Sequence, residues 1–85
     1  MGGGLSDREH KTLQLEAVRF KHAGVKVGRI RELFGESETR YYARLDALLD
    51  EPAAVAAYPA VVRRLIRLRQ ARRVARSGAY SGVNG

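Results

Sequence analysis

The chain has 85 residues, enough for a single domain with a small core. Hydrophobic residues make up 45% of it and charged residues 29%, a composition typical of a folded domain rather than a disordered chain. It contains no cysteine, which excludes disulfides, thiolate zinc sites and cysteine nucleophiles. No apolar run approaches the ~20 residues of a membrane span, and the first residues lack a secretory pattern. We therefore expect a cytoplasmic protein without a membrane partner.

The net charge of +7 lies entirely in the C-terminal third of the chain. Residues 1–59 carry nine basic and nine acidic side chains, whereas residues 60–85 carry seven arginines and no acid. A localised basic block predicts a polyanionic partner, with nucleic acid favoured over an anionic membrane surface.

The N-terminal segment predicts a short leader followed by a helix. Residues 1–5 are glycine-rich, and we expect them to be flexible. Ser6 and Glu9 have the spacing of a capping box, from which a helix should run to about His22. Gly24 then stands where a helix would end in the left-handed conformation.

The central segment predicts a helix-turn-helix. A short helix over Lys26 to Phe34 should end at Gly35, and Ser37 should cap a second helix that runs to about Asp50. The apolar spacing of these two helices places four side chains inward: Ile30, Phe34, Tyr41 and Leu45.

The last third predicts a basic helix. Pro52 opens a short turn over residues 53–57, and Pro59 permits the last helix to start. Its apolar arc, which includes Leu68, indicates that residues 60–68 dock on the core. Residues 69–76 should project as a basic arm, and residues 77–85 should form a disordered tail. The predicted fold is all-α, a small helical bundle with a central helix-turn-helix (domain 6–68) and a basic C-terminal helix.

This pattern favours DNA binding. The second helix of such a unit enters a major groove, where arginine pairs with guanine edges and polar side chains meet phosphates. Basic residues of the preceding helix and of the C-terminal helix suit the backbone phosphates. The candidate DNA-binding residues are Lys26, Arg29, Ser37, Thr39, Arg40, Tyr42, Arg44, Arg63, Arg64, Arg67, Arg69, Arg72, Arg73 and Arg76. The alternative for Arg40 and Arg44 is pairing with Asp46 or Glu36.

Residues 30–45 resemble the helix-turn-helix of sigma-factor region 4 and of response-regulator-type proteins. From Leu5 to about Arg76 the segments LSDRE, TRYYARLDALLDEP and RRLIRLRQARR are similar to a small uncharacterised family of actinobacterial and actinophage proteins. Glu36 departs from the pattern, which usually has an apolar residue there. The resemblance implies DNA binding by a small transcriptional regulator, bacterial or phage-encoded, without naming a target.

Two other functions remain open. The chain is an alternative candidate for an interaction protein that binds RNA polymerase or another transcription protein, with the helix-turn-helix as a scaffold. The acids of the first predicted helix, Asp7, Glu9 and Glu16, leave room for such a partner surface. RNA binding through the arm is less favoured, because the arm lacks interleaved aromatic residues. His10 and His22 stand alone, and Ser37 has no histidine as its base, so we expect no metal, no cofactor and no enzymatic activity. A homodimer is plausible because one helix-turn-helix reads only a few base pairs, with residues 53–57 and 60–68 as candidate contact surfaces.

Overall fold

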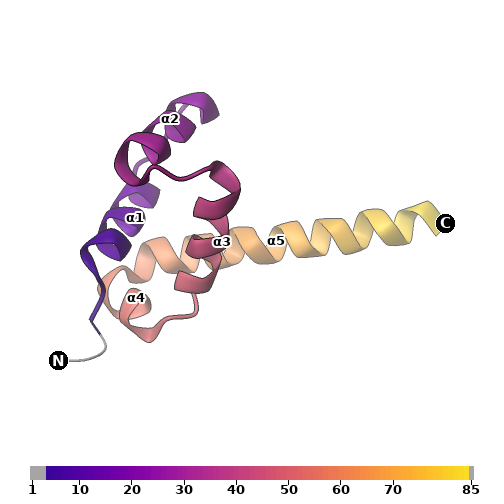
Figure 1. Ribbon diagram of the computed structural model, residues 1–85. Coiled ribbons are helices and arrows are strands. Elements are labelled where there is room, and N and C mark those ends of the chain that lie inside the picture. Colours follow the sequence, from indigo (N-terminus) through magenta and orange to yellow (C-terminus); the bar gives the residue numbers. More distant parts are fainter. Residues whose placement is uncertain (1–3, 85) are drawn as a thin grey trace.

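The computed structural model describes residues 4–84, with side chains described for residues 4–75. This range forms five helices and no strand: α1 (Asp7–Ala17), α2 (Ala23–Phe34), α3 (Glu38–Leu48), α4 (Pro52–Ala57) and α5 (Pro59–Asn84). In Figure 1, α1 to α4 gather around the first half of α5, and the rest of α5 runs out past them. The elongated envelope, 52 × 29 × 20 Å, reflects this projection. The predicted all-α bundle with a central helix-turn-helix is confirmed.

The first helix begins at the predicted capping box. The Ser6 hydroxyl accepts from the Glu9 amide at 3.1 Å, and the Ser6 amide donates to the Glu9 carboxylate at 2.8 Å. Residues 1–3 lie outside the described part of the chain. Leu5, the last residue of the predicted leader, is partly buried against the core.

The boundary between α1 and α2 differs from the prediction. α1 ends at Ala17, where Val18 turns into an extended conformation, rather than at about His22. Valine and phenylalanine are weak helix formers, and Phe20 packs against the core from the connecting segment instead. Gly24 does not terminate a helix, because it lies in the first turn of α2.

The turn between α2 and α3 follows the sequence closely. Gly35 adopts the left-handed conformation with φ of 61°, and its amide donates to the Arg31 carbonyl at 2.8 Å. A residue with a Cβ is strained there, so glycine suits this turn. The Ser37 hydroxyl accepts from the Arg40 amide at 3.2 Å and caps α3, as predicted.

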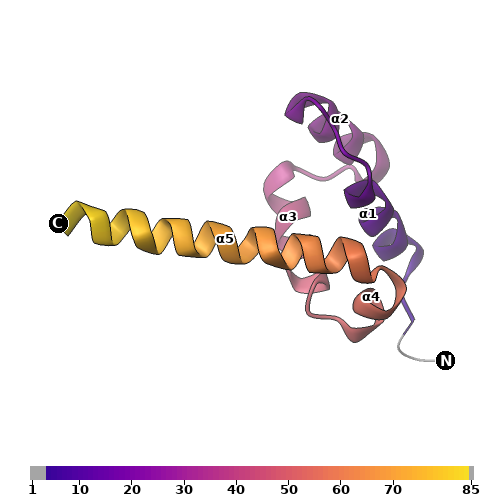
Figure 2. The same ribbon diagram turned by 180° about the vertical axis from the view of Figure 1, so that it is seen from behind.

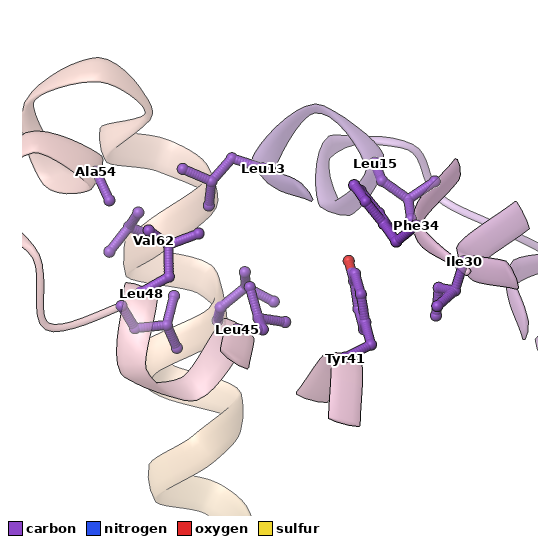
Figure 3. Close-up of a cluster of buried hydrophobic side chains, with 11 residues drawn as sticks. Leu13, Leu15, Ile30, Phe34, Tyr41, Leu45, Leu48, Ala54 and Val62 are labelled. Atoms are coloured by element: carbon purple, nitrogen blue, oxygen red, sulfur yellow. The ribbon is translucent and has the colours of Figure 1, made fainter. Parts of the chain in front are cut away.

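The core lies where α1, α3, α4 and α5 meet and continues between α2 and α3. Figure 3 shows Leu13, Leu48 and Val62 gathered on one side, with the ring of Tyr41 facing Phe34 on the other. The predicted inward set, Ile30, Phe34, Tyr41 and Leu45, is buried throughout. The 3–4 spacing of apolar residues was therefore sufficient to orient both helices.

The last helix docks through a narrower stripe than expected. Val62 and Leu65 are buried, but Leu68 is half exposed although its position on the apolar arc predicts docking. The docked part extends one residue further than residue 68, because Arg69 is held against α3. The side chains of residues 70–75 are exposed.

The tail also differs from the prediction. α5 continues through Asn84, over nearly all of the segment 77–85 for which its composition predicts disorder. No proline follows Pro59, and glycine or serine lowers helix propensity by only about 0.5–1 kcal/mol each. None of the helices within residues 4–84 combines the length and hydropathy required to span a bilayer.

Candidate nucleic-acid interface

The exposed face of α3 is built by the first turns of that helix. Burial of Tyr41 and Leu45 turns Thr39, Arg40 and Ala43 to the outside. Within the described residues, the guanidinium of Arg40 takes part in no ion pair or side-chain hydrogen bond. A free guanidinium beside a small alanine on the first turns of a helix suits close approach to base edges.

Arg44 does not lie on that face. Its guanidinium binds the Glu36 carboxylate, with Nη2 at 2.7 Å from Oε1 and Nε at 3.0 Å from Oε2, and donates to the Thr12 hydroxyl at 2.8 Å. It also lies 4.9 Å from the centre of the Phe34 ring. Arg44 is therefore turned inward and is not a free DNA-binding candidate, and the alternative of pairing with Glu36 is confirmed.

Glu36 is the centre of this cluster. Its side chain is only 7% exposed and also lies 3.7 Å from Arg8. The hydrogen bonds from Arg44 lower the pKa of the Glu36 carboxyl against the opposing effect of burial. The sequence marks Glu36 as a departure from an apolar pattern, and the structure gives the reason: the turn is held by a charged network rather than by an apolar contact.

Lys26 is likewise held inside the domain. Its ammonium lies 2.9 Å from the Glu16 carboxylate and 5.2 Å from the centre of the Tyr42 ring. Glu16 is 3% exposed and also accepts from the Tyr41 hydroxyl at 2.5 Å. Burial, followed by the bond to Glu16, raises the pKa of the Tyr41 phenol, which therefore remains protonated as the donor. Glu16 is consequently not available on the surface of helix 1 as the interaction hypothesis requires.

The arginines of α5 divide into three groups. Arg64 is partly buried and donates to the backbone carbonyl of Glu16. Arg63 and Arg67 are exposed on the face of α5 turned away from the buried Val62 and Leu65.

The third group faces α3. Arg69 pairs with Asp46 at 3.0 Å and with Asp50 at 3.4 Å, so it is a docked residue and not the first residue of a free arm. Arg72 and Arg73 follow it by three and four positions, lie on the same side of the helix, and are exposed. The side chain of Arg76 lies outside the described residues.

The remaining candidates are placed as follows. Arg29 forms an exposed ion pair with Glu32 at 2.9 Å on the surface of α2. Ser37 uses its hydroxyl as the α3 cap. Tyr42 is half-buried, edge-on to Tyr41, and faces the α5 side of α3. The structure thus brings Tyr42, Arg72 and Arg73 together between α3 and α5, whereas Thr39 and Arg40 are exposed on the first turns of α3 and do not line that space.

A model of a family described as "Protein of unknown function (DUF3263)" matches residues 4–77. This match covers most of the chain, so the protein belongs to that family. No curated protein and no solved structure matches the chain. In residues 4–75, no group of three or more His, Asp or Glu side chains is placed to hold a metal ion.

Proposed function

We propose that this member of the DUF3263 family is a double-stranded DNA-binding protein, either sequence-reading or nucleoid-type, that acts as a small transcriptional regulator. In this proposal α3 enters the major groove and the basic part of α5 contacts phosphates. The observation that carries it is that each of the two helices exposes basic side chains without described partners: Arg40 on the first turns of α3, and Arg72 and Arg73 on the α3 side of α5.

The charge distribution supports duplex DNA as the partner. Two of the acids near the interface, Asp46 and Asp50, are paired with Arg69, so they do not oppose a polyanion as free carboxylates. Phosphate contacts from arginine release counterions and make binding strongly dependent on salt. Base contacts from Arg40 and its neighbours would then provide any preference for a sequence.

The test is a titration of purified protein against random duplex DNA, single-stranded RNA and a pool of genomic fragments, each at two salt concentrations. We expect salt-sensitive binding to the duplex, with enrichment of particular fragments if α3 reads bases. Uniform recovery of fragments would identify a nucleoid-type protein. Absence of duplex binding at both salt concentrations would contradict the proposal.

A protein partner, such as RNA polymerase or another transcription protein, is the second candidate, and one observation favours it. The segment between α1 and α2 and the adjacent side of α5 enclose a hollow of about 650 Å³, in which Val18 and Leu68 are about half exposed. Exposed apolar side chains that line a hollow are typical of contact sites. Substituting Val18, which lines this hollow and not the groove between α3 and α5, with serine should then abolish activity in cells while DNA affinity stays intact.

A further inference from the structure

A groove of about 850 Å³ lies between α3 and the part of α5 that continues past it. Figures 1 and 2 show from both sides that α5 crosses α3 and then leaves the globule, which creates the angle that the groove occupies. Leucines from both helices, among them Leu45 and Leu68, form its apolar lining. Tyr42 lines it from α3, and Arg72 and Arg73 line it from α5.

The charges of the groove do not cancel. Its two acids are each matched by a basic partner, Glu16 by Lys26 and Asp46 by Arg69. Arg72 and Arg73 remain, and no described acid pairs with either of them. The groove therefore carries two uncompensated positive charges next to an apolar wall, which matches a ligand with anionic groups spaced along an uncharged, partly apolar chain.

We propose that this groove receives one sugar-phosphate strand of the duplex that α3 reads, with Arg72 and Arg73 as its phosphate ligands. The inference rests on the proposed DNA binding and names the contact site within it. The strand that borders a major groove runs beside a helix inserted there, and Ala43, on the exposed face of α3, also lines the groove. Tyr42 and the leucine wall face the sugars, whereas the two guanidinium groups face the phosphates.

The same geometry makes Arg69 a positioning residue rather than a phosphate ligand. Its guanidinium is engaged by Asp46 and Asp50, and its side chain is only 17% exposed. It compensates the acids at the point where α3 crosses α5 and holds the two walls of the groove together. Arg69 therefore affects the bound strand indirectly, because it fixes the angle between α3 and α5 and with it the positions of Arg72 and Arg73.

The test compares two pairs of arginines on the same helix. Arg72→Gln with Arg73→Gln removes two charges from the groove, and Arg63→Gln with Arg67→Gln removes two charges from the opposite face. Binding to a fluorescent 20-base-pair duplex is measured by anisotropy at four or more salt concentrations. All four side chains are exposed, so we expect both variants to fold, and circular dichroism melting is the check.

The groove variant should bind on the order of 10-fold more weakly per arginine removed near 0.1 M salt, and the slope of log K against log salt should fall by about 1.8. The opposite-face variant should keep the wild-type slope. Equal losses in the two variants would overturn the groove assignment while leaving DNA binding intact. A wild-type chain that does not bind the duplex would instead contradict the proposed function itself. The same groove-specific loss with single-stranded RNA would overturn the assignment to a duplex strand.

A third variant separates positioning from contact. Arg69→Gln should weaken duplex binding and leave the salt slope unchanged, because no phosphate contact is removed. A fall of about 0.9 in that slope, the value of one lost contact, would show that Arg69 is a direct ligand and overturn its positioning role.

Discussion

Two nitrogens of the Arg44 guanidinium, Nε and Nη2, donate hydrogen bonds to the carboxylate of Glu36 in the turn that joins α2 to α3. The same guanidinium reaches Thr12 on α1, whose hydroxyl in turn donates to the Arg8 carbonyl. One side chain of α3 is thereby tied to the turn and to α1. The exposed face of α3 owes its orientation to a residue that is itself turned inward.

Replacing Arg44 should destabilise the domain rather than change its sequence preference. Arg44→Ala leaves the buried Glu36 carboxylate without its main partner, and we expect the free energy of unfolding to fall by about 3 kcal/mol. Thermal and urea melts measure this loss. A combined Glu36→Leu and Arg44→Leu variant, which replaces the pair by apolar contact, should recover most of it. An unchanged melting temperature for Arg44→Ala would show that the pair contributes nothing to the fold.

Acid should weaken the ion pair between Glu36 and Arg44. The pKa of Glu36 lies below its ordinary value of 4.5 in the folded state, so the unfolded chain takes up a proton first as the pH falls. The stabilisation from Glu36 is therefore complete well above pH 4.5 and is lost as the pH falls below that value and through the folded-state pKa.

The measurement is the difference in melting temperature between wild type and Glu36→Gln from pH 7 to pH 3. Wild type should be the more stable at pH 7, and the difference should shrink on acidification. The other carboxylates titrate in both proteins and cancel in the difference. A difference in melting temperature that grows at low pH would contradict the lowered pKa of Glu36 in the folded state.

Arg40 should show the opposite behaviour to Arg44. Because its guanidinium is exposed and free of described partners, Arg40→Ala should leave the melting temperature within ~1 °C of wild type. On a cognate site selected from the fragment pool, it should cost about 1–3 kcal/mol and relax the sequence preference. Lys11→Ala, at an exposed site on α1, is the matched control and should leave the preference unchanged. Equal losses on every sequence would argue against base readout.

Two leucines allow one substitution to be compared in two environments. Leu45 is 5% exposed and Leu68 is 50% exposed. Leu45→Ala removes buried methyl groups and leaves a cavity, so we expect a loss of about 2–5 kcal/mol. Leu68→Ala should change stability by ~0.5 kcal/mol or less. Comparable losses at both positions in urea melts would indicate that the half-exposed side of α5 is covered in solution.

Local signals in the sequence determined most of the secondary structure. The capping box at Ser6, the left-handed Gly35, the Ser37 cap and the two prolines act through neighbouring backbone atoms, so their effect is readable from a few residues. The inward set from Ile30 to Leu45 was likewise readable, because helical periodicity needs no knowledge of the partner surface. The excess of arginine after residue 59 also identified the basic part of α5.

Only the tertiary structure decided which charged residues are free. Arg44 meets Thr12 from 32 positions away, and Arg69 meets Asp46 from 23 positions away. Such pairs depend on how helices cross, and side-chain periodicity within one helix carries no information about that crossing. The end of α1 at Ala17 is a further case, since the burial of Phe20 against the core competes with continuation of the helix. Periodicity identifies which residues of a helix face outward. Contacts between distant elements decide which of those side chains are paired within the domain and which remain free for a partner.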